Sequence, residues 1–200
     1  MTANNTQMNG NATFLDTIMI YQSMSGDADS GTSVFTMTGG SLTSKNGHIF
    51  HVTNTNAVIT LENVTLVNED EDNVLLSVCA DGWSGGDNIA ALNAKNQALT
   101  GNILVGSDST LTLSLTDGSS FTGTISGSIT NGKDQTVSTE VGSVTVILDE
   151  TSTWSLTADT YITAFEGNVE NIQGDYTLYV NITLDNPCRE NMIRKNGTLK

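Results

Sequence analysis

The chain has 200 residues, of which 37% are apolar, and this is enough for one domain with a hydrophobic core. No apolar run approaches the roughly 20 residues that a membrane-spanning helix requires, so we expect no membrane insertion. The formal net charge of −15 argues against nucleic acid as a partner, because such a surface repels a polyanion.

The composition predicts many strands joined by tight turns. One proline and 19 glycines accompany many threonine, serine and asparagine residues. Threonine favours strands, whereas glycine, asparagine and aspartate tolerate the left-handed conformation of tight turns. Apolar residues alternate with polar ones, as at Leu111, Leu113 and Leu115, so a period of two fits better than a helical period.

The first part of the chain contains a repeated phrase. After a short apolar segment at 18–21 and a polar loop at 25–32, residues 35–42 (FTMTGGSL) align position for position with residues 59–66 (ITLENVTL). Each copy has two alternating apolar residues, a Gly-Gly or Glu-Asn corner, a Ser or Thr, and another apolar residue. We therefore predict strand, corner and strand in each copy.

The middle of the chain contains an apolar strand and then a polar loop with a tryptophan. Cys79 belongs to the apolar pattern that begins at residue 74, which favours a buried thiol. The distant Cys188 could form a disulfide with Cys79, but we favour free, buried thiols for both residues. The loop at 80–88 (ADGWSGGDN) follows directly. No apolar alternation demands an indole at Trp83.

A second repeated phrase occupies residues 113–121 (LSLTDGSSF) and 146–154 (VILDETSTW), separated by the loop 130–142. The alignment places Trp154 beside Phe121 and predicts that both are core residues. It also places Asp117 and Asp149 at corners, where aspartate serves turn geometry. We expect Tyr161, Tyr176 and Tyr179 to pack within strands, because they alternate with apolar residues.

These repeats predict an all-β fold, a right-handed parallel β-helix (β-solenoid) of about seven or eight coils. Each coil would pair its strands with those of the coils above and below. A β-sandwich is the alternative with the same composition, but it has no reason to reuse one phrase along the chain. We expect residues 1–185 to form one β-helix domain. Residues 186–200, which hold four of the seven Lys and Arg residues, would form a basic C-terminal tail or cap.

Several phrases resemble the C-terminal region of large bacterial surface proteins with pectin-lyase-like parallel β-helices, described as carbohydrate-binding-domain or adhesin-like proteins. The phrases are residues 18–44, 51–66, 75–83, 109–125 and 152–165. The resemblance implies a parallel β-helix at the cell surface or outside the cell. It suggests glycan association and supplies no catalytic residue.

Glycan recognition uses an aromatic face against a pyranose ring and polar side chains toward its hydroxyl groups. Trp83, with Asp81, Asp87 and Asn88 beside it, is the binding site that we predict from the sequence; the alternative is that Trp83 folds back onto the flank of the coils. The expected partner is a neutral glycan or a host surface protein. End-to-end association of chains through terminal coils is a further expectation.

Catalysis is not expected. A polyuronate lyase needs cations, but only three lysines precede Arg189. The aspartates that could serve glycoside hydrolysis fall at corners. Ice binding would need an unbroken row of outward-facing Thr residues on successive coils, and other residues interrupt that row in this sequence. We predict no metal or cofactor; calcium at residues 69–72 or at Asp27 and Asp29 is a weaker alternative. His48 and His51 are predicted to lie on the surface, without the partners of a metal site.

The sequence therefore predicts a non-enzymatic β-helix module that is glycan-binding or adhesin-like. The alternative is a purely structural stalk or spacer of a larger surface protein. The two differ in whether the loops bind anything.

Overall fold

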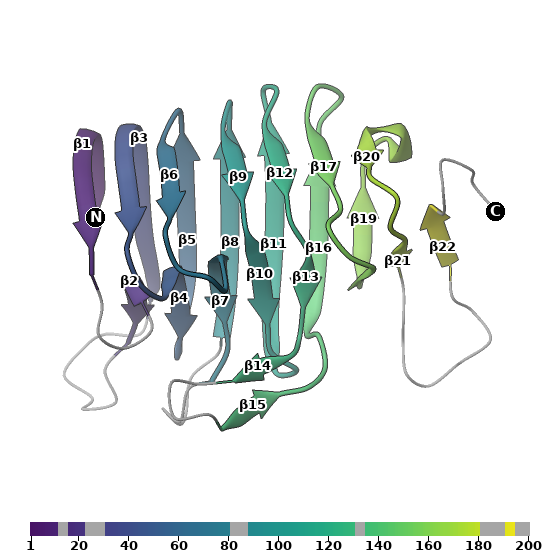
Figure 1. The fold of residues 1–200 in the computed structure, drawn as a ribbon, viewed down its shortest axis with the longest axis horizontal. Coiled ribbons are helices and arrows are strands. Elements are labelled where there is room, and N and C mark those ends of the chain that lie inside the picture. Colours follow the sequence, from purple (N-terminus) through teal and green to yellow (C-terminus); the bar gives the residue numbers. More distant parts are fainter. Residues whose placement is uncertain (12–15, 23–30, 81–87, 131–134, 181–190, 195–200) are drawn as a thin grey trace.

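The computed structural model describes residues 1–11, 16–22, 31–80, 88–130, 135–180 and 191–194 (Figure 1). The described residues form an all-β protein with no α-helix; their one helical segment is the 3₁₀ turn η1 (Val169–Asn171). Most strands pair in parallel. The all-β prediction is confirmed.

The largest sheet follows the order of the chain. Its hydrogen-bonded path runs β1-β3-β5-β8-β11-β16-β19, and β6 also pairs with the long β3. All pairs in this sheet are parallel. The strands are β1 (Thr2–Gly10), β3 (Thr32–Ser44), β5 (Thr55–Glu62), β6 (Thr65–Asn68), β8 (Asn88–Lys95), β11 (Ser109–Thr116), β16 (Ser143–Leu148) and β19 (Ala164–Glu166).

Two further parallel sheets take up the intervening strands. The second runs β2-β4-β7-β10-β13 and the third β9-β12-β17-β20, again in chain order. The chain thus returns repeatedly to the same sheets, one position further along each time (Figure 1). The strands are β2 (Asp16–Tyr21), β4 (His48–Thr53), β7 (Val74–Val78), β10 (Asn102–Val105), β13 (Ile125–Ser126), β9 (Ala98–Thr100), β12 (Ser120–Thr122), β17 (Thr153–Ser155) and β20 (Ile172–Gln173).

Both repeated phrases occupy matching positions in these sheets. Phe35 is the direct parallel partner of Ile59, its counterpart in the second copy of the first phrase. Leu113 is likewise the partner of Val146, its counterpart in the second phrase, and the register continues through Phe121 and Trp154 in the third sheet. The alignment made from the sequence is therefore confirmed at the level of single residues.

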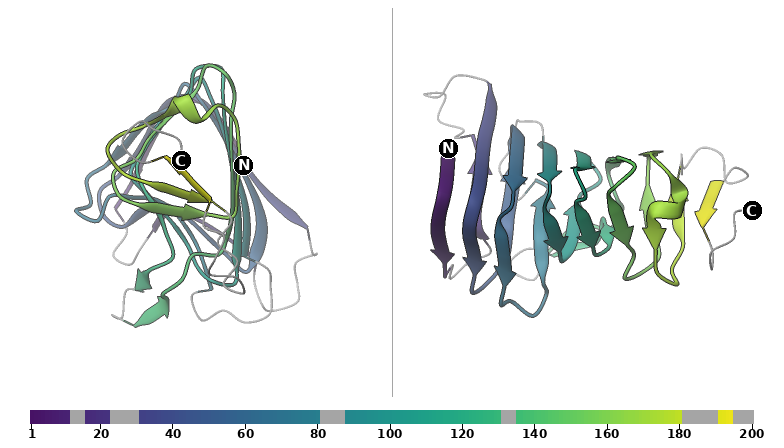
Figure 2. Two further views of the ribbon diagram at one scale, coloured as in Figure 1. Left: turned by 90° about the vertical axis from the view of Figure 1, so that its right-hand side faces the viewer. Right: turned by 90° about the horizontal axis from the view of Figure 1, so that it is seen from above.

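Strand alternation builds one continuous core. In β11 every second residue from Ser109 to Leu115 is buried, and the residues between are partly exposed. Side chains from strands of all three sheets join the same buried cluster, which extends from Ala3 to Val180. Seen along the long axis, the strands surround this common interior (Figure 2). Trp154, Phe121, Phe50 and Met37 are among its largest fully buried side chains.

Residues at one corner of successive strands share a left-handed backbone. Asn5, Gly39, Asn63, Asn96 and Asp117 have φ angles of 48°, 64°, 55°, 44° and 56°. The first two lie within β1 and β3, and the other three come directly after β5, β8 and β11. They lie beside one another because these strands are paired in register. Such φ values favour Gly, Asn and Asp, which explains why the predicted corners carry these residues.

The next residue along this corner requires glycine for a second reason. At Gly40, φ is +81°, and a Cβ atom would lie 2.1 Å from the backbone oxygen of Thr6 on the neighbouring strand. Any side chain at residue 40 would force the two backbones apart.

Two antiparallel pairs depart from the parallel pattern. β14 (Ile129–Thr130) and β15 (Thr136–Ser138) form a hairpin that projects from one corner (Figure 2). β15 lies within the segment predicted as the loop 130–142, and β14 overlaps its first residue. At the other end, β18 (Thr160–Ile162) pairs in parallel with β21 (Leu178–Val180), and β22 (Asn191–Arg194) pairs with β21 in antiparallel fashion. β22 is the described part of the expected C-terminal cap.

Cys79 is buried, as predicted, and its Sγ lies 3.5 Å from Ser77 Oγ. Cys188 falls outside the described residues. The prediction that the tyrosines pack within strands is confirmed for Tyr161 and Tyr179, which are partners in β18 and β21, and is wrong for Tyr176, which lies outside the strands and is 44% exposed. The Tyr161 residue is itself 41% exposed. In β18 the buried neighbours of Tyr161 take the inward positions, and alternation therefore turns its ring outward.

Candidate functional site

The predicted binding loop lies largely outside the described residues, and this applies to Asp81, Trp83 and Asp87. Asn88 is described and begins β8, where it is 7% exposed. Its Oδ1 accepts a hydrogen bond of 2.8 Å from the backbone N–H of Asn54, which has a left-handed φ of 52°. The Asn88 carboxamide therefore supports the turn between β4 and β5.

The corner aspartates have the structural role that the sequence predicts. Asp149 Oδ2 accepts a hydrogen bond from the backbone N–H of Asp117, and its Oδ1 accepts from Thr151 and Ser152. Partial burial opposes ionisation of this carboxyl group, but the hydrogen bonds from Ser152, Asp117 and Thr151 outweigh it. Together they lower the pKa of Asp149 from 3.8 to about 2.

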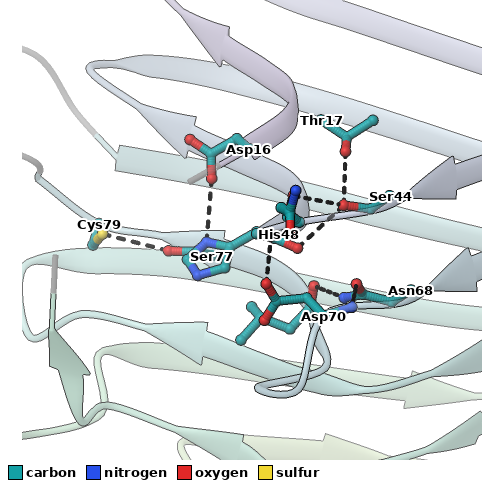
Figure 3. A network of polar contacts seen from close by, with 11 residues as sticks. Asp16, Thr17, Ser44, His48, Asn68, Asp70, Ser77 and Cys79 are labelled. Carbon is teal, nitrogen blue, oxygen red and sulfur yellow. Dashed lines mark hydrogen bonds and ion pairs between the residues drawn. The ribbon is translucent and has the colours of Figure 1, made fainter. Parts of the chain in front are cut away.

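The acidic run at residues 69–72 also closes a turn. Asp70 Oδ2 accepts a hydrogen bond of 2.7 Å from Gly47 N–H, and Asp70 Oδ1 accepts one of 3.0 Å from Asp72 N–H. Both carboxylate oxygens thus accept hydrogen bonds from backbone groups, and Figure 3 shows Asp70 within this polar network. Asp27 and Asp29 lie outside the described residues.

A groove of about 600 Å³ lies beside the β14–β15 hairpin. One wall comes from β13 and the residues after it, the second from the residues that follow β15, and the third from β18 and its flanks. Its lining residues are Thr124, Ile125, Ser126, Gly127, Ser128, Thr139, Glu140, Val141, Gly142, Ala158, Asp159, Tyr161, Ile162 and Thr163. Those at positions 128, 139, 140, 159, 161 and 163 are exposed, so the groove is open to solvent.

Tyr161 supplies the aromatic surface of this groove. Its ring stacks on that of Tyr179 with centroids 4.5 Å apart and an interplanar angle of 8°. The two residues are direct partners in the parallel pair β18–β21, so the backbone register holds the stack. Tyr161 lines the groove, whereas Tyr179, which covers one face of the Tyr161 ring, does not.

The polar groups of the groove are hydroxyls and carboxylates. Among the described residues, Glu140 and Asp159 are the only charged residues that line it, and none of the described lining residues is basic. Asp159 Oδ1 accepts a hydrogen bond of 2.8 Å from Thr177 N–H, and Thr163 Oγ1 accepts one of 3.0 Å from Val144 N–H. Backbone groups therefore orient these side chains before any ligand arrives.

A second cluster lies where β2 pairs with β4 (Figure 3). Asp16 and His48 are direct partners, and Asp16 Oδ1 lies 3.3 Å from His48 Nδ1. One ligand atom each from Asp16, His48 and His51 lies within 4.8 Å of the other two. His51 is 3% exposed, so the prediction that both histidines lie on the surface is wrong.

Sequence reasoning missed both sites for identifiable reasons. One sequence feature pointed to the groove. The short phrases TYI and LYV place Tyr161 and Tyr179 at matching strand positions, each between two residues whose side chains face inward. No sequence feature pointed to the histidine cluster, because residues three apart in a regular strand, such as His48 and His51, point to opposite faces. β4 does not follow this rule for burial, since every residue from Ile49 to Thr53 is buried.

No family model, curated protein or solved structure matched this chain. Among the described residues, no helix has the length and apolar character needed to cross a membrane.

Proposed function

We propose that this chain is a right-handed parallel β-helix module of a secreted or cell-surface bacterial protein, and that it binds a neutral glycan without catalysing its breakdown. The architecture is supported by three sheets that the chain revisits in order, with each strand paired in parallel to the strand of the next pass. Crossover connections between parallel strands of one sheet are right-handed in about 98% of cases, which supports the handedness. The seven strands on the path of the largest sheet support a count of about seven or eight coils.

The groove beside Tyr161 is the observation that carries the proposed function. An aromatic ring, oriented hydroxyls and two carboxylates are the groups that proteins use against the apolar face and the hydroxyls of a sugar. Its volume of about 600 Å³ is within the usual range for small-ligand sites. The described lining residues include two carboxylates and no basic side chain, which favours a neutral glycan over a polyuronate.

The predicted loop around Trp83 remains a proposed second contact for the same class of ligand. Trp83, Asp81, Asp87 and Asn88 form the binding set inferred from the sequence. The groove and the loop are separate hypotheses about where a glycan binds, and single variants distinguish them.

A glycan array tests the proposal, followed by calorimetric titration of the best neutral ligand. We expect Tyr161→Ala to weaken binding by about 10-fold, because lost aromatic contact corresponds to roughly 1.4 kcal/mol. Tyr176→Ala is the matched control, since Tyr176 is 44% exposed and does not line the groove. A Trp83→Ala variant reports on the loop.

Three outcomes would count against this function. Absence of binding to every neutral glycan would leave the structural stalk or spacer as the better account. If Tyr161→Ala and Tyr176→Ala changed glycan affinity equally, the groove would be rejected as the binding site. Release of shortened sugars from a bound glycan would contradict the non-enzymatic proposal, and Glu140→Gln would then test the groove carboxylates.

A further inference from the structure

The Asp16, His48 and His51 cluster combines two features that rarely occur together on a sheet. All three side chains carry metal-binding atoms, and all three are largely buried: the side chains of Asp16 and His48 are 7% and 14% exposed, and His51 is 3% exposed. Neither Asp16 Oδ1 nor His48 Nδ1 makes a hydrogen bond within the described part of the chain. Their contact with each other is an ion pair only if His48 is protonated.

The spacing of these atoms fits a small tetrahedral ion. With bonds of about 2.0–2.1 Å, such an ion separates its ligand atoms by roughly 3.3–3.4 Å. The distance between Asp16 Oδ1 and His48 Nδ1 is 3.3 Å, and the His51 ligand atom lies within 4.8 Å of both. The two imidazole centroids are 6.3 Å apart and the rings are inclined by 53°, and one ligand atom from each of the three residues lies in the same small region.

The ligand types select the class of ion. Calcium and magnesium prefer sites made of oxygen atoms, whereas two imidazoles and one carboxylate suit zinc and related divalent transition metals. We infer that Asp16, His48 and His51 form a binding site for a divalent transition metal, with Zn²⁺ as the best-fitting ion. Three protein ligands leave a fourth tetrahedral position for water or for a donor from a partner.

The backbone holds this site in place. β2 and β4 pair in parallel, with Asp16 opposite His48 and Met19 opposite His51. His51 is also the direct partner of Ser77, which is fully buried in β7. A bound ion would therefore link β2 to β4 near the N-terminal end of the stack and stabilise their pairing, since binding to the folded state adds to its stability.

The site is independent of the proposed glycan groove. The ligands lie on β2 and β4, whereas the groove lies beside the β14–β15 hairpin and β18. Loss of metal binding and loss of glycan binding are therefore separate results.

The first experiment needs no variant, because the chain contains only two histidines. Full-length protein without a polyhistidine tag is labelled with ¹⁵N-histidine and titrated with Zn²⁺. We expect calorimetry to give one ion per chain and imidazole nitrogen signals of both histidines to shift together. No binding, or a shift of one histidine alone, would overturn the proposal.

The second experiment assigns the ligands. His48→Gln, His51→Gln and Asp16→Asn should each raise the Kd for Zn²⁺ by at least about 10-fold, because even outer-sphere partners have effects of this size. Glu71→Gln is the control: it removes an exposed carboxylate from the acidic run and should leave the Kd unchanged. Far-UV circular dichroism checks that each variant folds.

Wild-type affinity in His48→Gln and Asp16→Asn would overturn the site, whatever the behaviour of the more buried His51→Gln. An equal loss in Glu71→Gln would indicate ions bound by the acidic run, which also contradicts the assignment. A rise in thermal stability with Zn²⁺ in the wild type alone would support the link between β2 and β4.

Discussion

The indole of Trp154 stacks on the ring of Phe121, its counterpart in the preceding copy of the repeated phrase, with ring centroids 5.6 Å apart and an interplanar angle of 24°. The two residues are direct partners in the pair β12–β17, and both are fully buried. Trp154 Nε1–H also donates a hydrogen bond of 3.1 Å to the carbonyl of Gly123. Two neighbouring passes of the chain are thus joined through one stacked pair.

Trp154→Ala should lower the free energy of unfolding by about 3–5 kcal/mol, because it leaves a large cavity beside Phe121. Urea denaturation followed by circular dichroism measures the change. Tyr176→Ala, at an exposed position, should change the same quantity by no more than about 0.5 kcal/mol. A loss below about 1 kcal/mol in Trp154→Ala would contradict the packing described for this pair.

Asn96 allows the left-handed corner to be tested with a matched pair of variants. Its φ is 44°, and its Nδ2 donates a hydrogen bond of 2.8 Å to Asn63 Oδ1. Asn96→Ala should cost about 1–2 kcal/mol, because alanine is strained in this conformation. Asn96→Gly loses the same amide contact but adopts the corner freely, so it should be the more stable variant in thermal unfolding. The reverse order would show that the backbone conformation is not what selects the residue.

The Gln97 side chain takes the place of a neighbouring strand as hydrogen-bond partner for the Val64 backbone. The side chain is buried; its Oε1 accepts a hydrogen bond from Val64 N–H at 2.7 Å, and its Nε2 donates to Val64 carbonyl oxygen at 2.8 Å. Gln97→Leu keeps much of the volume but leaves both Val64 groups without this partner, and we expect a loss of about 2–4 kcal/mol. Chemical denaturation checks this, with the exposed Gln173→Leu as control. Equal stability of the two variants would be inconsistent with the role of Gln97.

Asp149 should contribute to stability in a defined pH window. Because its pKa is lowered to about 2 in the folded protein from 3.8, the charged form is favoured by folding. The stabilisation is fully present above pH 3.8 and is lost as the pH falls through about 2. After allowance for solvent screening, we expect Asp149 to contribute on the order of 1 kcal/mol to the free energy of unfolding.

Urea denaturation of wild type and Asp149→Asn between pH 2 and pH 6 tests this window. The difference in unfolding free energy should be constant at the upper end and shrink as the pH falls below about 4. Glu150→Gln removes one negative charge from the adjacent exposed position and controls for net charge. A difference that grows on acidification would show that the sign of the effect is wrong.

The candidate sites were less accessible to prediction than the strands. The sequence predicts a loop at 130–142, but nothing in it shows that residues 139–142 line a groove. The sequence places Tyr161 in a strand, but alternation alone does not tell whether the tyrosine or its apolar neighbours face the core. No pattern in the sequence pairs Asp16 with His48, since neither residue belongs to a repeated phrase that would align the two.

The sequence by itself determined the strands, the corners and their alignment. These depend on short-range rules: alternation with a period of two, and residues that tolerate a left-handed backbone where the chain turns. Only the tertiary structure decided that Asp16, His48 and His51 converge and that a groove opens beside Tyr161. Those arrangements depend on which strands become neighbours and in what register, and a change of one residue in register would send each of these side chains to the opposite face.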